Sequence, residues 1–246
     1  MQSPAMEKSI IKFHHCKKEI YCFFVPEQCP ICEENLSAMR LEEAPVSIPN
    51  PFVNGHREKC SFVLRPTKGS FLKDYDGQSD LHVGITNTSG VVYNYNENGI
   101  LRDTQSWEHC VSVPLVQPDM YSLLDQWNKY LEQFSESETW LPYSYDEVDH
   151  NCYTYALTFI NCVLATQGKH PLSKNEFTEK FVLPKTKRAS RYIAIYKEIS
   201  ENYFHIVECY SAKGKQTRRT RREKRVAHCL KKNIKLPCIA LVVHML

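Results

Sequence analysis

Two residues far apart in the chain, His82 and Cys152, have types and settings that could do chemistry together. His82 lies in an apolar run that predicts a β-strand, and Cys152 begins a segment whose apolar spacing predicts an α-helix. Backbone N–H groups in the first turn of a helix lower the pKa of a thiol and can hold an oxyanion. An imidazole nearby can take the thiol proton and return it to a leaving group. The pair therefore suits acyl transfer by a cysteine nucleophile; the alternative is an inert core thiol and a structural histidine.

A second group of candidate residues lies near the N-terminus. Cys29 and Cys32 form one CxxC knuckle, whose two sulfurs can reach a single tetrahedral Zn²⁺. Cys16 is the expected third ligand, and His14 or Cys22 the fourth. A segment this short and poor in apolar residues would need the metal to fold. Residues 1–40 are thus predicted to form a small zinc-ribbon-like module with structural Zn²⁺, with unligated thiols or a redox pair as the alternatives.

Composition narrows the class of protein. The chain has 246 residues, 42% hydrophobic and 24% charged, which allows one or two domains with a real core. It contains no apolar run of the roughly 18 residues that a membrane span requires. The N-terminal residues also lack the apolar stretch of a secretory signal. We therefore expect an intracellular protein, cytoplasmic or nuclear or both, whose eleven cysteines are not a disulfide framework.

The charge of the chain is unevenly distributed. The net charge is +3, but eleven of the 31 Lys and Arg residues lie from Lys213 onward, with a single acid among them. The rest of the chain is mildly acidic, which argues against a uniformly basic nucleic-acid-binding domain. The segment Lys213–Arg225 predicts a nuclear-import signal or a nucleic-acid contact, or else a solvated arm. Residues 211–246 are interpreted as a basic tail.

Residues 59–210 contain the elements that would position His82 and Cys152. A proline-containing stretch over residues 41–58 reads as a linker before them. The expected strands are Cys60–Pro66, the hairpin Leu81–Thr86 and Val91–Tyr95 with its turn at Thr88–Gly90, Trp107–Val116, Tyr192–Ile199 and Tyr203–Cys209. The expected helices begin near Pro118, Cys152 and Ser173. This order of strands, helices and strands predicts an α+β domain.

Two segments resemble the PPPDE superfamily of desumoylating isopeptidases. YSYDEVDHNCYTYALTFINCVL (Tyr143–Leu164) resembles its nucleophile segment, and LHVGITNTSGVVYNYNENGI (Leu81–Ile100) resembles its histidine strand and hairpin. The resemblance implies a circularly permuted papain-like fold, with Cys152 as nucleophile, His82 as base and Asn151 beside the nucleophile without an assigned role. It also implies action on an isopeptide or thioester carbonyl, in a ubiquitin-like conjugate or an acylated protein. The chain departs from the family in having one glycine, Gly99, after the hairpin, and it shows no obvious third residue to orient the histidine.

Over residues 9–164 the chain also resembles the makorin-2 opposite-strand protein family. The resemblance rests on SIIKFHHC, VPEQCPIC and DHNCYTYALTFINCVL. It implies no activity. Two hypotheses follow: a cysteine hydrolase of isopeptidase or thioesterase type, or a catalytically inactive interaction protein that uses the papain-like fold and the zinc module for binding. A solvent-accessible His82–Cys152 pair favours the enzyme, and a sealed or separated pair favours the binding protein.

Overall fold

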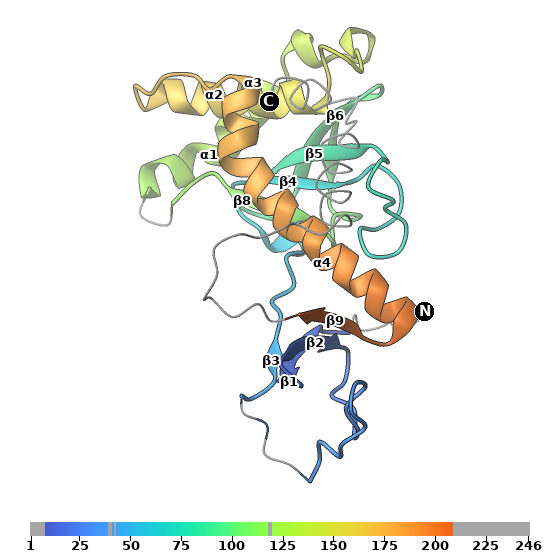
Figure 1. The fold of residues 1–246 in the computed structure, drawn as a ribbon. Coiled ribbons are helices and arrows are strands. Elements are labelled where there is room, and N and C mark those ends of the chain that lie inside the picture. The colour runs from blue at the N-terminus through green and yellow to red at the C-terminus, as the bar shows by residue number, and fades with distance from the viewer. Residues whose placement is uncertain (1–7, 39–40, 42, 118–119, 209–246) are drawn as a thin grey trace. The chain divides into compact units, whose positions relative to one another are not determined.

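The computed structural model describes residues 8–38, 41, 43–117 and 120–208 (Figure 1). The predicted basic tail, residues 211–246, lies outside this range. The chain forms two compact units. Within the described part of the chain, the first unit comprises the residues up to Pro51 together with those from Ser190 on, and the second comprises Phe52–Ala189. Among the described residues, no helix is both long enough and apolar enough to cross a membrane.

The first unit contains a four-stranded antiparallel sheet in the order β3-β1-β2-β9. Its strands are β1 (Ile11–His15), β2 (Lys18–Cys22), β3 (Val46–Ser47) and β9 (His205–Glu208). Alternation along the strands directs Phe13 and Ile20, which are cross-strand partners, into a small core. Cys22, Cys29 and Leu36 complete the buried part of this core. The sheet therefore needs strands from both ends of the described chain.

The second unit is built on a five-stranded antiparallel sheet in the order β7-β6-β5-β4-β8. The strands are β4 (Ser61–Pro66), β5 (Leu81–Thr86), β6 (Val92–Asn96), β7 (Gly99–Asp103) and β8 (Val111–Pro114). The predicted hairpin is β5 and β6. Its turn is set by the Asn87 side chain, which accepts hydrogen bonds from the backbone N–H groups of Ser89 and Val91. This sheet positions His82.

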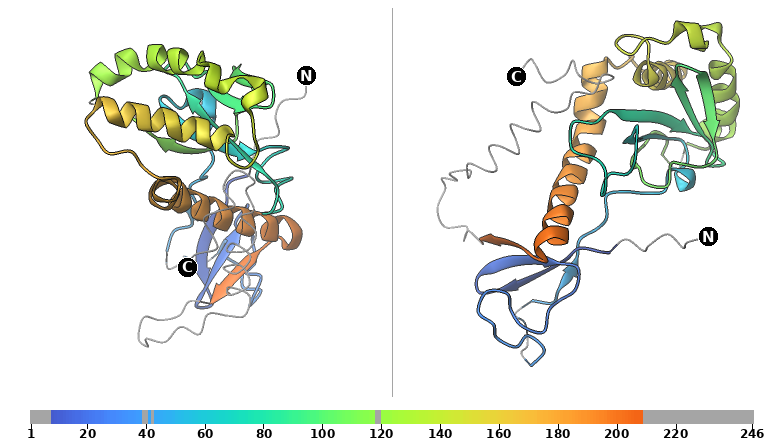
Figure 2. Two further views of the ribbon diagram at one scale, coloured as in Figure 1. Left: turned by 90° about the horizontal axis from the view of Figure 1, so that it is seen from above. Right: turned by 90° about the vertical axis from the view of Figure 1, so that its right-hand side faces the viewer.

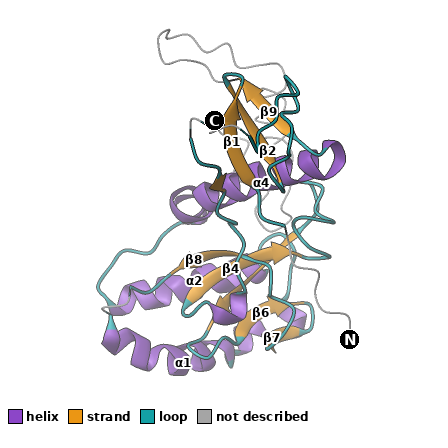
Figure 3. Ribbon diagram, turned by 90° about the horizontal axis from the view of Figure 1, so that it is seen from below, coloured by secondary structure: helices purple, strands orange, loops and turns teal. Residues whose placement is uncertain are grey.

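Helices α1 (Tyr121–Ser135), α2 (Cys152–Thr166) and α3 (Lys174–Phe177) cover one face of that sheet. Helix α3 continues through a π-helical turn at Thr178–Val182 into α4 (Leu183–Asn202), whose residues from Ser190 on belong to the first unit. Short 3₁₀ turns lie at Gly55–Arg57, Glu138–Trp140 and Pro142–Ser144. Helices α1 and α2 lie side by side (Figures 2 and 3), and Trp127 of α1 packs edge-on against Phe159 of α2 with ring centroids 5.1 Å apart. All three tryptophans, Trp107, Trp127 and Trp140, are buried.

The structure confirms the α+β class and corrects three details. Tyr192–Ile199, predicted as a strand, lies within α4, because its aromatic and β-branched residues also follow a helical spacing. The predicted strand at 203–209 is β9, and Cys209 lies outside the described residues. Residues 41–58 are not a plain linker, since β3 pairs with β1 and the Gly55 N–H donates to the Trp107 carbonyl. The compact units also differ from the predicted division at residues 40 and 59, because β9 pairs with β2 and the part of α4 from Ser190 on belongs to the same unit.

Candidate functional site

Four side chains of the first unit, His15, Cys16, Cys29 and Cys32, bring their donor atoms within 4.8 Å of one another. The first two come from the end of β1 and the tight turn that follows it. In this two-residue turn both Cys16 (φ 52°) and Lys17 (φ 58°) adopt the left-handed conformation of a type I′ turn, which usually selects Asn and Gly. Such backbone strain costs on the order of 1–3 kcal/mol per residue and persists where the surroundings require it. The turn places the Cys16 thiol beside the CxxC knuckle.

The spacing of the donor atoms fits one tetrahedral metal ion. Zn–S bonds of about 2.3 Å and Zn–N bonds of about 2.1 Å at tetrahedral angles separate two sulfurs by about 3.8 Å, and a sulfur from a nitrogen by about 3.6 Å. The observed Cys16–Cys29 Sγ distance is 4.0 Å. His15 Nδ1 lies 3.1 Å from Cys16 Sγ and 3.6 Å from Cys32 Sγ. The cluster could therefore bind a metal through one imidazole and three thiolates.

Glu34 supplies an outer partner for this cluster. Its Oε2 lies 3.6 Å from His15 Nε2, the ring nitrogen that faces away from the sulfurs, and 3.5 Å from Cys32 Sγ. A carboxylate on the far nitrogen of a ligating imidazole fixes the tautomer and makes the other nitrogen a better ligand. The backbone N–H of Ile31 points at Cys29 Sγ from 3.4 Å, which would stabilise a thiolate. These contacts prepare the four side chains to act as ligands.

The structure changes the candidate for the fourth ligand. Cys16, Cys29 and Cys32 gather as predicted, but His15 joins them instead of His14 or Cys22. Successive side chains of a strand point to opposite faces, so His14 turns away and instead meets Glu43 at 2.9 Å. Cys22 is 1% exposed within the apolar core, where burial raises the pKa of its thiol to about 11 and so disfavours a thiolate. Neither His14 nor Cys22 is therefore placed to act as a metal ligand.

In the second unit, His82 is oriented by a chain of hydrogen bonds. The Asn94 Nδ2 donates to Asp103 Oδ2 at 2.9 Å, and Trp107 Nε1 donates to the same oxygen. Because a carboxylate can only accept, the amide oxygen of Asn94 is left to face His82 Nε2, at 2.8 Å. His82 Nε2 therefore carries a proton and donates. Sequence reasoning missed Asn94 and Asp103 as the residues that orient this histidine.

This arrangement sets the charge and the tautomer of the imidazole. Burial lowers the pKa of His82, and the hydrogen bond that His82 donates to Asn94 only partly offsets that effect. The ring is therefore neutral near pH 7, with its proton on Nε2. Its other nitrogen, Nδ1, has no hydrogen-bond partner among the described residues and is a free acceptor. The ring has the electronic form that a general base requires.

The sheet separates the His82 ring from the helix that begins at Cys152. His82 pairs with Arg65 of β4, and both side chains contact Trp107: the Arg65 guanidinium lies 4.7 Å from that ring centre and the His82 ring 5.8 Å. The other face of β4 meets α2, where Phe62 packs edge-on against Tyr153. His82 thus points to the face opposite the helices.

Cys152 has a different environment. It is the first residue of α2 and is 1% exposed. No hydrogen bond joins it to His82, although both lie in the described part of the chain. The arrangement gives the predicted catalytic pair no geometric support, and the sealed thiol matches the condition stated above for a binding protein.

The His-Asn-Cys triplet has clear structural roles. Asn151 is fully buried and caps α2: its side-chain oxygen accepts from the N–H groups of Tyr153 and Thr154. Its amide nitrogen donates to the carbonyls of Glu147 and Val148, which ties the preceding loop to the helix. The ring of His150 stacks on Trp140 with centroids 4.8 Å apart. The triplet therefore anchors the start of α2 whether or not the thiol reacts.

Comparison with known proteins places the chain in a family. Two family models match it, DUF4796 N-terminal over residues 8–36 and DUF4796 C-terminal over residues 45–199. The chain belongs to the DUF4796 family. It is 58% identical over 202 residues to the human MKRN2 opposite strand protein, an alignment that covers 82% of this chain and 91% of the relative. No solved structure matches the chain. The predicted resemblance to the opposite-strand proteins is confirmed.

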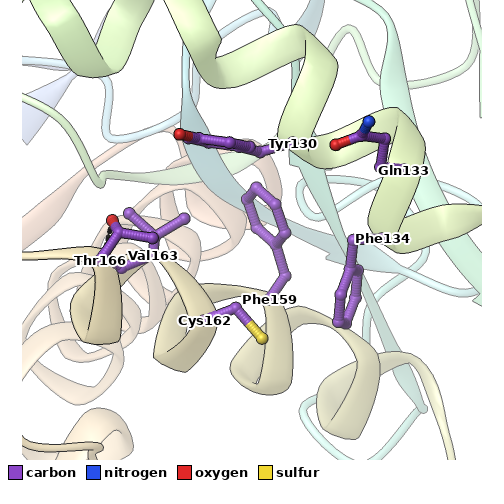
Figure 4. A pocket seen from close by; sticks show the side chains of 7 residues that line it. All are labelled: Tyr130, Gln133, Phe134, Phe159, Cys162, Val163 and Thr166. Carbon is purple, nitrogen blue, oxygen red and sulfur yellow. Dashed lines mark hydrogen bonds between the residues drawn. The ribbon is translucent and has the colours of Figure 1, made fainter.

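The two DUF4796 models divide the candidate sites between them. The N-terminal model contains all four residues of the His15 cluster, and the C-terminal model contains both His82 and Cys152. Within the latter, α1 and α2 also enclose an apolar pocket of about 140 Å³ (Figure 4). Phe134, Phe159 and the exposed Cys162 line it. Its other polar lining groups belong to Tyr130, Gln133 and Thr166, and no His, Asp, Glu, Lys or Arg lines it. The His15 cluster and the surroundings of His82 are therefore the two candidate sites.

Proposed function

We propose that this DUF4796 protein binds one zinc ion at His15, Cys16, Cys29 and Cys32 and uses the ordered first unit for binding to other proteins, without catalysis at this ion. The observation that supports the proposal is the gathering of the four donor atoms within 4.8 Å. Zinc held by three thiolates and one imidazole has no open position for water or substrate, which is typical of structural sites. When bound, the ion would cross-link the β1–β2 turn to the CxxC knuckle.

Several features of the first unit suit a binding role. The apolar cluster that contains Cys29 has five buried residues, so a metal cross-link at this small cluster would add to the stability of the unit. Large apolar side chains remain on its surface, with Phe24 71% exposed, Val46 55% exposed and Ile206 41% exposed. These side chains are accessible for contact with a partner protein.

Metal analysis of the purified full-length protein tests this proposal. We expect one zinc per chain by elemental analysis, and a loss of that zinc in the double variant Cys16→Ser/Cys29→Ser. Cys162→Ser is the matched control, because Cys162 is exposed and lies outside the cluster. A wild-type protein that takes up no zinc after incubation with the metal, or a double variant that retains it fully, would overturn the proposal.

A cysteine hydrolase of isopeptidase or thioesterase type is the second candidate, and the tautomer of His82 favours it. Asn94 accepts a hydrogen bond from His82 Nε2, which holds the proton on that nitrogen and leaves Nδ1 able to act as a base. Cys152 would attack the carbonyl of a ubiquitin-like conjugate or an acylated protein, and the N–H groups of the first turn of α2 would hold the oxyanion. The opposed orientation of His82 and the burial of Cys152 stand against it.

Covalent labelling distinguishes the two candidates. Wild type, Cys152→Ala and Cys162→Ala are incubated with a ubiquitin-like probe and an acyl probe that both end in a thiol-reactive group. Adduct formation that requires Cys152 and tolerates Cys162→Ala would establish the hydrolase. Equal labelling of wild type and Cys152→Ala would remove Cys152 from any mechanism and leave the interaction role.

A further inference from the structure

A polar pocket opens beside His82, on the sheet face turned away from α1 and α2. Its volume is about 290 Å³, close to the lower end of the range for small-molecule sites. One side of the pocket is formed by side chains from four neighbouring strands, β4 to β7: Arg65, His82, Asn94 and Asp103. The exposed carboxylates of Asp80 and Glu147 also line it. The pocket thus combines one cation, a neutral imidazole and several acids.

Arg65 is the residue of this pocket that lacks a partner. Its guanidinium rests on the fully buried ring of Trp107, 4.7 Å from the ring centre. Its Nε is buried without a hydrogen-bond partner, and no ion pair or hydrogen bond to this side chain occurs within the described residues. A buried donor without an acceptor costs free energy, on the order of 1–3 kcal/mol, and more when it is charged. The terminal nitrogens are not sealed in this way, and a ligand oxygen in the pocket would give the guanidinium the acceptor that it lacks.

His82 supplies the complementary group. Asn94 and Asp103 hold its proton on Nε2, so Nδ1 offers a lone pair without a donor among the described residues. A ligand that satisfies both Arg65 and His82 must carry acceptor oxygens for the guanidinium and an N–H group for the imidazole. The planar guanidinium binds carboxylates in bidentate geometry, and stacking on Trp107 holds it ready for this.

We propose that this pocket binds a carboxylate that bears an N–H group on the adjacent carbon, the chemistry shared by free α-amino acids and by the C-terminal residue of a peptide. The carboxylate pairs with Arg65 and the N–H donates to His82 Nδ1. The acids Asp80 and Glu147 favour an ammonium over an amide nitrogen, so the free amino acid binds more tightly. This proposal depends on neither the zinc cluster nor Cys152, so failure of either experiment above leaves it standing.

Nuclear magnetic resonance of the full-length ¹⁵N-labelled protein tests it, with glycine, N-acetylglycine and acetate as probes. The signals followed are the Nε–Hε group of Arg65 and the ring nitrogens of His82. We expect saturable shifts with glycine at a Kd on the order of 1–30 mM, which suits a ligand of five heavy atoms. N-acetylglycine, which mimics a peptide terminus, binds several-fold more weakly, and acetate, which lacks the N–H, shifts only the Arg65 signal. Saturation by N-acetylglycine at lower concentration than glycine would instead identify the peptide terminus as the source.

Variants connect the response to the proposed groups. Arg65→Gln abolishes the saturable shifts, and Arg65→Lys, a milder change, weakens them at least about tenfold because a bidentate contact is lost. Arg102→Gln is the matched control, since that arginine pairs with Glu132 outside the pocket. The proposal is overturned if wild type shows no saturable shift with glycine or N-acetylglycine, or if Arg65→Lys titrates like wild type.

Discussion

Two adjacent histidines provide a sharp test of the proposed zinc site. His15 faces the three cysteines, whereas its neighbour His14 contacts Glu43 at 2.9 Å and Glu19 at 3.4 Å. Loss of an outer partner of a metal ligand typically costs 10–100-fold in affinity. Removing a ligand by His15→Ala should therefore cost at least about 100-fold, or about 2.7 kcal/mol. His14→Ala removes only part-exposed ion pairs, which contribute at most about 1 kcal/mol to stability and nothing to zinc affinity.

The assay is competition between each variant and a chromophoric zinc chelator, followed by urea unfolding with and without zinc. At zinc concentrations near 1,000 times Kd, the metal adds about 4 kcal/mol to stability. His15→Ala should lose about two thirds of that gain, and His14→Ala should retain it. Equal zinc affinities for the two variants would refute the assignment of His15, and a loss confined to His14→Ala would restore the ligand predicted from the sequence.

Three further predictions concern the second unit. Asn151→Ala should lower the free energy of unfolding by about 2–4 kcal/mol, measured in urea, because it removes the cap of α2 and two part-buried hydrogen bonds to the preceding loop. A loss below about 0.5 kcal/mol would contradict this role. Hydrogen bonds from Arg102 and then Tyr93 lower the pKa of Glu132. Their contribution to the free energy of unfolding is therefore present above about pH 4.5 and is lost as the pH falls through the lower folded-state pKa. Glu132→Gln should lower the free energy of unfolding by under about 1 kcal/mol at pH 7 and by less at pH 3. Burial lowers the pKa of His82, so the imidazole binds a proton more readily in the unfolded chain than in the folded one. The free energy of unfolding should therefore fall as the pH drops below about 6.5. His82→Gln should flatten the dependence of this free energy on pH between about pH 7 and pH 5, and an unchanged dependence would contradict a buried neutral ring.

Local patterns predicted the elements that position the candidate sites. The alternation around His82, the turn residues before Gly90 and the apolar spacing after Cys152 correspond to β5, its turn and α2. Each of these elements is encoded over a few neighbouring residues, so a single sequence suffices. The prediction for Tyr192–Ile199 was wrong because the spacing of its apolar residues fits both the helical and the strand period. Nothing local in the sequence favours the helix over the strand.

The sites themselves depend on contacts that local patterns do not determine. His14 and His15 are equivalent as sequence, and only the register of the β1–β2 hairpin decides which one faces the knuckle. One local cue does favour His15 over His14 as a ligand, because His15 lies directly beside Cys16, the turn residue that was already a predicted ligand. On the paired strand β6, Asn94 is two residues from the position opposite His82, so the two side chains lie on the same face and Asn94 could have been considered as its partner. Asp103 reaches this pair only because the next hairpin brings β7 beside β6. The position of His82 relative to Cys152 depends on which sheet face the helices cover.

The pairing of β2 with β9 has a consequence for how the protein is made. Strand β2 ends at Cys22 and its neighbour in the sheet begins at His205, so a ribosome must add roughly 180 residues before the sheet can close. At ordinary rates of translation, 5–20 residues per second, the nascent β1–β2 hairpin waits about 10–35 seconds with one edge exposed to other chains. All four proposed ligands have been synthesised by Cys32, so zinc could fasten the hairpin throughout that interval. Scarcity of the ion during synthesis would then reduce the yield of folded protein more than its removal afterwards.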